Sequence, residues 1–328
     1  MKVFVTGATG LLGSFICREL LNRNHQVKAV KRNSSKMDLL EGIADQIEWV
    51  IGDMNDTAFL EEALVGIDAV IHGAAIISFD KRYVNKMYET NVLGTADLVN
   101  TCLKLGIKDF IHISSVAAIG RKAGQKKITE KDRWEDSKYD SIYANSKHAQ
   151  ELEVWRGAQE GLKVKILNPS VVLGPGIWGQ GGSTSVFEYA YKERSFHPEG
   201  NTNFVDVRDV AEIAVKLMES DIKGERFIVS AGSLPYKQFF QTLASAFGKK
   251  APTKTVQPWM LRLAVALEFI RSRVTGKEAL ITADTAILSR TKFNFANDKV
   301  RKALNFKFRS LEESANWTVA ELKNRYNL

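Results

Sequence analysis

Residues 2–13 read KVFVTGATGLLG, a short apolar run that passes directly into three glycines spaced three residues apart. The helix-like stretch that follows combines apolar Phe15, Ile16 and Leu20 with charged residues. A strand, a glycine-rich turn and a helix in this order are typical of dinucleotide-binding proteins. The first glycine permits the tight turn, the second lets backbone approach a diphosphate, and the third lets helix and strand pack closely. The segment therefore predicts a nucleotide cradle.

The start of the predicted helix is where phosphate contacts are expected. Its free amide groups and the positive end of its dipole favour an anion. A glycine triplet by itself would also fit an ordinary turn, but the flanking strand and helix favour the cofactor interpretation. We expect the cofactor to contact the residues of the turn and of the helix start: Gly7, Thr9, Gly10, Leu11 and Leu12.

The composition is that of an ordinary globular protein: 328 residues, of which 45% are hydrophobic and 26% charged. Cys17 and Cys102 lie in apolar helical patterns, which predicts buried thiols in a reducing compartment rather than a disulfide. The chain enters its first strand without room for a signal peptide, so we expect a cytoplasmic protein. The net charge is +8, but the basic residues are scattered among 38 acidic ones. This pattern predicts no nucleic-acid partner.

Short β-type runs alternate with helical patterns through the first half of the chain. The expected strands cover residues 2–6, 27–31, 47–51, 69–72, 110–113 and 164–167, and the expected helices cover 58–64, 84–105 and 142–159. This alternation predicts an α/β fold, a Rossmann-type doubly wound parallel sheet with helices on both faces. Such sheets bind ligands beyond the carboxyl ends of their strands, where the strand order reverses.

After Pro169 the alternation stops, and we expect a smaller, mostly C-terminal substrate-binding domain. Residues 1–170 and about 203–230 are assigned to the NADP-binding domain, and residues 171–202 and 231–328 to the interleaved substrate-binding domain. In the returning segment, residues 204–208 resemble a strand, and Asp209 is the expected N-cap of a helix that begins at Val210.

A later segment, residues 259–270, is apolar around most of a helix. Such a helix is more often part of a buried core than the wall of a substrate pocket or a membrane contact. Its most apolar part, residues 261–270, contains Arg262 and Glu268 and is too short to span a bilayer. We therefore expect a core helix and no membrane insertion.

Two further segments suggest a proton relay. Tyr143 and Lys147 are four residues apart, so on a helix their β-carbons are roughly 5–6 Å apart. A lysine ammonium lowers the pKa of a neighbouring phenol from about 10, which makes Tyr143 a candidate proton donor in carbonyl reduction. Ser115 follows an expected strand and would hold the substrate oxygen, with Ser114 as the alternative. A tyrosine four residues before a lysine is common on exposed helices, but the glycine turn and the serine favour catalysis.

Together these features resemble the extended short-chain dehydrogenase/reductase family over nearly the whole chain. TGATGLLG (residues 6–13) is similar to the cofactor turn of that family, and YANSK (residues 143–147) is similar to its active-site motif. The resemblance implies that Ser115, Tyr143 and Lys147 form the proton relay, and that Lys147 and Tyr143 also contact the cofactor. Other positions that match the cofactor contacts of the family are Asp53, Met54, Ala74, Ala75 and Pro169.

A purely structural role stays open at several of these positions. Asp53 is equally well explained by an ordinary turn, and Ala74 and Ala75 by core packing. Asn91 matches a helix asparagine that is more often structural, and Asn168 stands where many relatives carry arginine. The histidines are scattered and not at ligand spacing, so we expect no metal site.

The end of the second strand bears on the choice of cofactor. Residues 29–36 read AVKRNSSK, and no carboxylate appears before Asp38. An NAD-preferring site places an acid here to hold the ribose hydroxyls, whereas an arginine binds a 2′-phosphate through its planar guanidinium. By similarity, Arg32 aligns with the basic residue of NADP-preferring members of the family. We expect NADP, with NAD as the alternative; a solvated basic turn would also explain the pattern.

The expected activity is hydride transfer between the nicotinamide of NADP(H) and a carbonyl or secondary alcohol of a small, apolar or aromatic substrate. The pattern is most similar to dihydroflavonol reductases and 3β-hydroxysteroid dehydrogenase-like reductases. The alternative is a nucleotide-sugar epimerase or dehydratase. Epimerases of the family usually carry Arg-Asp-Phe at the end of the segment that here reads GNTNF (residues 200–204) and includes Asn203 but no arginine. Dehydratases carry an acid pair where this chain has Val116 and Ala117.

Two further expectations follow from the resemblance. A nucleotide sensor without turnover typically lacks the tyrosine or the lysine, so the presence of both disfavours it. The family pattern also implies a homodimer through the helices expected at residues 84–105 and 142–159.

Overall fold

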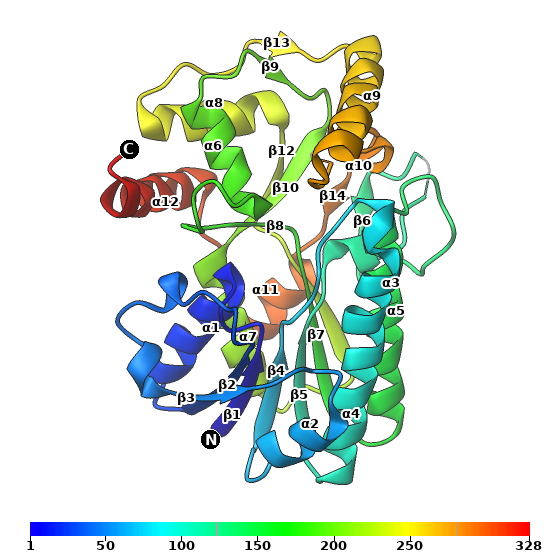
Figure 1. Cartoon of the computed structure of the whole chain (residues 1–328), viewed down its shortest axis with the longest axis vertical. Coiled ribbons are helices and arrows are strands. Elements are labelled where there is room, and N and C mark those ends of the chain that lie inside the picture. Colours follow the sequence, from blue (N-terminus) through cyan, green and yellow to red (C-terminus); the bar gives the residue numbers. More distant parts are fainter. Residues whose placement is uncertain (123, 280) are drawn as a thin grey trace.

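The computed structural model describes residues 1–122, 124–279 and 281–328. Within them, a seven-stranded sheet has the order β11-β7-β5-β4-β1-β2-β3, and every neighbouring pair is parallel (Figure 1). The strands are β1 (Lys2–Thr6), β2 (Gln26–Lys31), β3 (Ile47–Ile51), β4 (Ala69–His72), β5 (Asp109–Ile113), β7 (Lys163–Pro169) and β11 (Glu225–Val229). The predicted doubly wound sheet is confirmed. Its order reverses between β1 and β4, which is the position where such sheets bind ligands.

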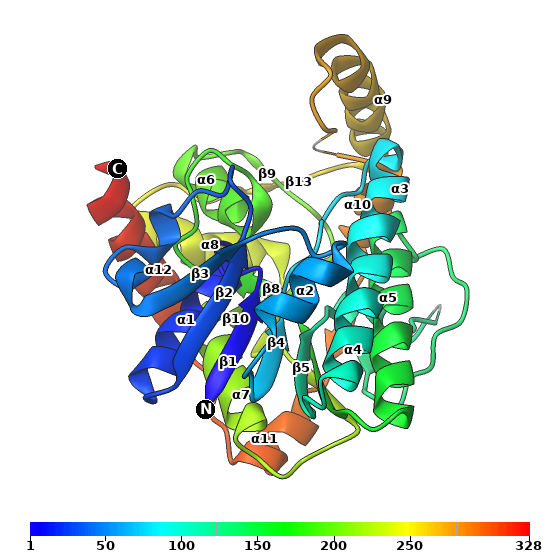
Figure 2. The same cartoon turned by 60° about the horizontal axis from the view of Figure 1, so that its bottom comes forward.

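Helices cover both faces of this sheet (Figure 2). One face carries α1 (Leu11–Asn22), α7 (Val207–Met218) and α11 (Asp298–Leu304), and the other carries α2 (Thr57–Ala63), α4 (Gly94–Lys104) and α5 (Ile142–Gln159). Side chains alternate along β1, so Val3 and Val5 enter the first core and Phe4 enters the second. Cys17 and Cys102 are free and buried in these two cores, as expected.

A second, smaller part of the molecule lies beyond the carboxyl ends of the sheet strands, in the upper part of Figure 1. It contains a three-stranded sheet of β12 (Gly232–Pro235), β10 (Asn201–Asp206) and β8 (Val171–Leu173). The helices that share a hydrophobic core with it are α6 (Ser185–Tyr191), α8 (Tyr236–Phe247) and α12 (Leu311–Tyr326). Two short strand pairs complete it: β9 (Phe196–His197) with β13 (Lys254–Thr255), and β6 (Lys127–Ile128) with β14 (Asn294–Phe295).

The remaining helical segments are short, apart from those described below. The three-residue turns are η1 (Asp38–Leu40), η2 (Ala44–Gln46), η3 (Lys81–Tyr83), η5 (Val116–Ala118) and η6 (Gly182–Thr184). The helix expected over residues 84–105 consists of α3 (Val84–Met87), the π-helical η4 (Tyr88–Leu93) and then α4.

The returning segment differs from the expectation. Its strand, β10, ends at Asp206 and pairs with β8 and β12 rather than with the main sheet. Asp206, not Asp209, is the N-cap of α7, because it is the last extended residue and its carboxylate accepts a hydrogen bond from the Arg208 amide at 2.8 Å. Asp209 lies in the first helical turn, where it is buried and paired with Arg309.

The C-terminal segment also departs from the predicted division of the chain. Val300 of α11 and Phe306 belong to the same core as β1, α1 and α7, although residues 231–328 were assigned to the substrate-binding domain. Apolar residues in a segment do not reveal which of two cores they join. The other boundaries between the two expected domains stay predictions.

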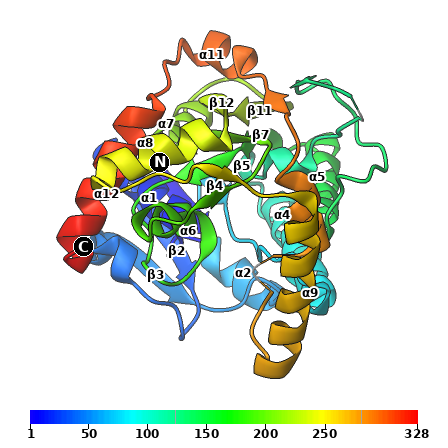
Figure 3. The ribbon, with the colours of Figure 1, turned by 90° about the horizontal axis from the view of Figure 1, so that it is seen from above.

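The expectation of a core helix over residues 259–270 is wrong. These residues form α9 (Pro258–Thr275), and of its residues, all of them described, Ser272 alone is buried. Figures 2 and 3 show α9 at the rim of the molecule, and α10 (Ala283–Leu288) contacts it. An apolar helical pattern indicates a surface that favours burial, but the pattern does not supply a neighbour that covers it. No helix in the described part of the chain has both the length and the hydropathy needed to span a bilayer.

Candidate active site

The glycine turn between β1 and α1 excludes side chains at two positions. Gly7 has φ +74°, and a Cβ on it would lie 2.8 Å from the Ala74 nitrogen. A Cβ on Gly13 would lie 2.1 Å from the Gly7 carbonyl oxygen, so only glycine lets α1 pack on the turn. Gly10 is the N-cap of α1, and the first helical turn has neither a capping side chain nor an acidic residue. This arrangement fits the diphosphate of a dinucleotide.

The segment that follows β4 is held against the glycine turn by Thr6. The Thr6 hydroxyl oxygen accepts hydrogen bonds from the amides of Gly73 and Ala74, at 3.2 and 3.1 Å. The same hydroxyl lies 2.7 Å from Nδ1 of His72, and burial lowers the pKa of His72 to about 3. Thr6 thus holds Ala74 beside the turn, and the neutral His72 contacts the same hydroxyl.

Two of the predicted cofactor contacts, Arg32 and Asp53, lie at the ends of the next strands. Arg32 directly follows β2; its side chain is exposed and has no ion pair in the described part of the chain. Asp53 follows β3, is exposed, and accepts a hydrogen bond from the Asn55 amide at 3.0 Å, with Met54 between them. Both positions match the expected side of the sheet, and their roles stay predictions.

The structure brings Ser115 and Tyr143 together. Ser115 directly precedes η5, just beyond β5, and Tyr143 lies in the first turn of α5, which Ser141 caps. A side-chain hydrogen bond with Ser115 favours the phenolate, but burial has the larger effect and raises the pKa of Tyr143 to about 12. The Ser114 hydroxyl is buried on the side of Glu151. Of the two serines, Ser115 is therefore the one beside the phenol.

Lys147 is buried on the same helix, with 2% of its surface exposed. Its Nζ donates hydrogen bonds to the Ile113 carbonyl oxygen at 3.2 Å and to Oε1 of Gln150 at 2.5 Å. Burial lowers the pKa of Lys147 to about 7, and the charge of Glu151 partly opposes this. The expected lowering of the Tyr143 pKa by this ammonium is not what the structure shows, because its hydrogen bonds go elsewhere and burial dominates both groups.

A buried polar chain that the sequence analysis missed connects Lys147 to the glycine turn. Gln150 accepts from Lys147 and donates to the Thr95 hydroxyl at 2.8 Å, and that hydroxyl lies 2.7 Å from Nε2 of His72. His72 contacts Thr6 in turn. The spacing of Lys147 and Gln150, three residues apart on one helix, was the available signal. Their partners on β1, β4 and α4 were not visible from that spacing.

A second polar group lies behind Ser115. The Asn168 amide donates to Oε1 of Glu151 at 2.5 Å and to the Ser115 carbonyl oxygen at 2.9 Å. Burial raises the pKa of Glu151, and Arg226 contacts its other oxygen at 3.5 Å. Asn168 is thus fully buried and positions backbone, directly before Pro169 at the end of β7.

Apolar side chains flank the serine and the tyrosine. The ring of Phe79 lies 5.7 Å from that of Tyr143 between centroids. Val116, next to Ser115, and Tyr139 both pack against the hydrophobic cluster that contains Phe293, and the rings of Tyr139 and Phe293 meet edge to face at 5.0 Å. The surroundings of the pair are therefore largely apolar on these sides.

Asn203 and Asn91 both have structural partners. Asn203 donates to the Phe293 carbonyl oxygen at 2.9 Å and accepts from the Phe295 amide at 3.2 Å. Asn91 makes the same kind of double contact with the backbone of Ile76, at 2.7 and 3.0 Å. Both side chains hold neighbouring backbone in place.

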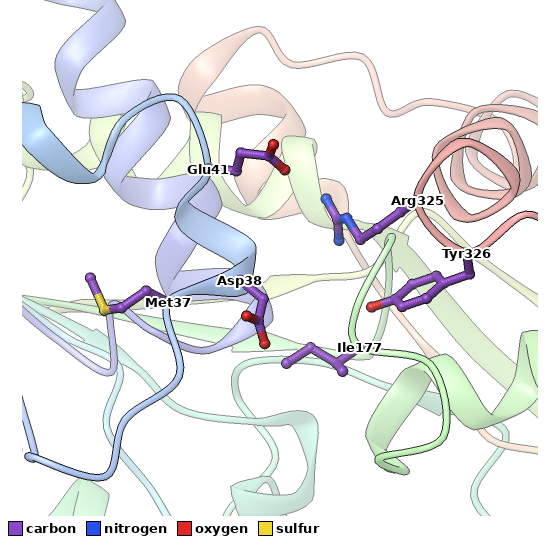
Figure 4. Close-up of a pocket in the computed structure, with 6 residues that line it drawn as sticks. All are labelled: Met37, Asp38, Glu41, Ile177, Arg325 and Tyr326. Atoms are coloured by element: carbon purple, nitrogen blue, oxygen red, sulfur yellow. The ribbon is translucent and has the colours of Figure 1, made fainter.

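A cleft of about 550 Å³ lies between the segment after β2 and the C-terminal helix α12 (Figure 4). It is lined by Met37, Asp38, Glu41, Ile177, Arg325 and Tyr326. None of the predicted catalytic residues lines it, so we place the chemistry at the end of β5 and not in this cleft. Among residues 1–122, 124–279 and 281–328, no group of three or more His, Cys, Asp or Glu side chains could hold a metal ion.

Comparisons with known proteins show similar sequences and a similar fold. The model of the NAD dependent epimerase/dehydratase family matches residues 3–230. A protein of Synechocystis sp. that carries a dihydroflavonol 4-reductase name is 32% identical over 262 residues, 78% of this chain and 76% of that protein. Sterol demethylase protein B of Methylococcus capsulatus is 30% identical over 268 residues, 80% and 79% of the two chains. The crystal structure of gox2253 matches with a TM-score of 0.83 and 27% identity, over 99% of both chains.

Proposed function

Because the chain belongs to the NAD dependent epimerase/dehydratase family, we propose that it is an NADP(H)-dependent oxidoreductase acting on a carbonyl or secondary alcohol. Hydride would pass between the nicotinamide and a small, apolar or aromatic substrate. The observation that carries the proposal is the Ser115–Tyr143 pair beside the buried Lys147, at the carboxyl end of β5. The neighbouring glycine turn, with Gly7 and Gly13 closed to side chains, supplies the place for the dinucleotide.

The proposed mechanism assigns one task to each of these three residues. The bound cofactor supplies the hydride. Tyr143 donates a proton to the substrate oxygen, and its pKa of about 12 keeps the phenol protonated at neutral pH, as carbonyl reduction requires. The Ser115 hydroxyl holds the same oxygen. Lys147 would donate from its ammonium to the ribose hydroxyls of the nicotinamide, the role that the family resemblance gives it.

The choice of an apolar substrate rests on the surroundings of the pair. Phe79 lies against Tyr143, and Val116, next to Ser115, packs against an apolar cluster that Tyr139 also joins. Both polar ends of Asn203 are engaged with backbone, which leaves them unsuited to bind the diphosphate of a nucleotide sugar. These features favour simple reduction or oxidation over the epimerase or dehydratase alternative.

The test is NADPH consumption with ketosteroids, dihydroflavonols, aryl aldehydes and acyl-CoA thioesters, with nucleotide sugars assayed separately for conversion. We expect stoichiometric NADPH loss with one carbonyl class. Tyr143→Phe should lower that turnover by about 10²–10⁴-fold, because the proton donor is removed. Tyr88→Phe, at an exposed tyrosine, is the control and should retain the wild-type rate. Conversion of a sugar without net NADPH loss would contradict the proposal.

The preference for NADP is tested separately at Arg32. Arg32→Ala should weaken NADPH binding by roughly 10–100-fold and leave NADH binding nearly unchanged, because only NADPH carries the 2′-phosphate. Lys223→Ala, an exposed lysine just before β11, is the control for the loss of one positive charge. An unchanged ratio of NADPH to NADH affinity in Arg32→Ala would remove the NADP assignment.

A further inference from the structure

Helix α9 carries a continuous apolar stripe that faces away from the protein. The stripe consists of Trp259, Leu263, Leu267, Ile270 and Val274, whose exposed fractions range from 52 to 81%. Their spacings of four, four, three and four residues place them on one helical face. Single exposed apolar residues are ordinary, but a stripe of five along a whole helix marks an interaction surface.

Helix α9 has distinct start and stop signals, although its apolar face is exposed. Pro258 occupies the first turn, and Gly276 ends the helix in the left-handed conformation with φ +68°. On the side opposite the stripe, the Ser272 side chain is buried and donates to the Phe269 carbonyl oxygen at 2.9 Å. Figure 2 shows α9 projecting from the body of the molecule, so its outer face is accessible to a flat surface.

The charges beside the stripe are positive. Arg262 and Arg273 are exposed on α9, Lys277 follows its end, and none has a carboxylate partner in the described part of the chain. The acidic Glu268 is paired with Arg271 at 2.8 Å. An apolar stripe flanked by unpaired basic residues is complementary to a layer of anionic headgroups over hydrocarbon.

We infer that α9 is an interfacial helix that docks the protein onto an anionic lipid surface. The stripe lies at the boundary between headgroups and acyl chains, and Arg262 and Arg273 contact the headgroups. The helix lies in the plane of the surface and does not cross it, in keeping with the lack of a spanning helix among the described residues. A second copy of the chain is the less suitable occupant, because antiparallel pairing of two such stripes brings arginines of one copy against arginines of the other.

The docking helix is tied to the segment that flanks the candidate active site. Arg82 donates to the carbonyl oxygen of Lys277 at 2.9 Å, and Ser78 hydrogen-bonds Glu278. Between them, Phe79 packs on Tyr143. Docking through α9 therefore brings this end of the molecule to the lipid. The inference concerns binding alone and does not depend on the proposed oxidoreductase activity.

Vesicle co-sedimentation at physiological ionic strength tests the inference. We expect the full chain to sediment with vesicles of phosphatidylserine and phosphatidylcholine, and at least ~10-fold less with pure phosphatidylcholine. Leu263→Asp/Leu267→Asp and, separately, Arg262→Glu/Arg273→Glu should each weaken binding to the anionic vesicles by ~10-fold or more. Circular dichroism and thermal unfolding show that the variants are folded.

Two matched controls lie at the amino ends of the sheet strands. Val65→Asp/Leu105→Asp introduces the same charges at exposed apolar residues before β4 and β5, and Lys108→Glu/Lys223→Glu changes the net charge as the arginine pair does. Both should bind like the wild type, because charges at that distance are screened.

The inference is overturned if the wild type does not bind anionic vesicles, or if the α9 variants bind as well as the controls. It is also overturned if light scattering shows a wild-type dimer that Leu263→Asp/Leu267→Asp dissociates, while no variant or wild type binds lipid. The stripe would then be a contact between copies of the chain.

Discussion

Helices α5 and α9 each have 18 residues, yet they relate to the rest of the molecule in opposite ways. On α5, even polar side chains are buried, among them Lys147, Gln150 and Glu151. On α9, large apolar side chains are exposed and a serine is the buried residue. The difference lies in the neighbours: α5 packs against both α4 and β7, whereas α9 lies at the rim. Burial follows from the surrounding elements, and α5 can hold a lysine in a low-dielectric site because other elements cover it.

The largest expected effect comes from placing the same charge on both helices. Val154→Asp on α5 should destabilise the protein by at least ~3 kcal/mol, because an unpaired carboxylate would be buried in the core between α4 and the sheet. Leu263→Asp on α9 should cost less than about 1 kcal/mol, mostly through helix propensity. Urea unfolding of both variants measures the difference. Similar losses would mean that α9 is covered in solution.

A smaller effect concerns the pH dependence of stability. Burial lowers the pKa of Lys147 from 10.5 to about 7, so between these values the unfolded chain holds a proton that the folded chain has lost. The free energy of unfolding of the wild type should therefore increase as the pH rises from about 7 to about 10, and Lys147→Met should lack this increase.

Thermal unfolding across this pH range measures that increase. The stability of Lys147→Met relative to the wild type should be highest near pH 6 and decline as the pH rises. Lys277→Met, at an exposed lysine just beyond α9, is the control, and its free energy of unfolding should change with pH as that of the wild type does. If the free energy of unfolding of Lys147→Met changes with pH as much as that of the wild type, the buried lysine does not titrate in this range.

The smallest effect is a shift in the pH profile of turnover. Gln150→Leu removes an acceptor of the Lys147 ammonium, so the fall of activity at high pH should begin about one pH unit lower. Gln150→Glu should move it in the other direction, because a carboxylate favours the ammonium. Ser272→Ala, at the buried polar residue of α9, should leave the profile in place. If both Gln150 variants lose turnover rate equally and the pH profile does not shift, Gln150 has a structural role only.

Much of the fold was predictable because its signals are local. The six expected strands of the main sheet are present, with ends displaced by at most two residues. The turn around Gly7 was predictable because its backbone conformation and close packing require glycine. Tyr143 and Lys147 were predictable as a pair, since four residues on one helix bring them to the same face. The capping residue of α7 was assigned to Asp209 rather than Asp206, because several carboxylates near a helix start leave the choice to the backbone.

The sequence by itself thus determined the α/β class, the cradle and the residues that come to the carboxyl ends of the strands, because these follow from nearest-neighbour sterics and periodicity. Tertiary structure alone decided which surfaces are covered. It buries Lys147 beside Gln150 and the chain to His72, and it leaves the apolar stripe of α9 exposed. The reason is physical: burial and the pKa values that follow from it depend on contacts between segments far apart in the chain, and a local pattern does not contain those contacts.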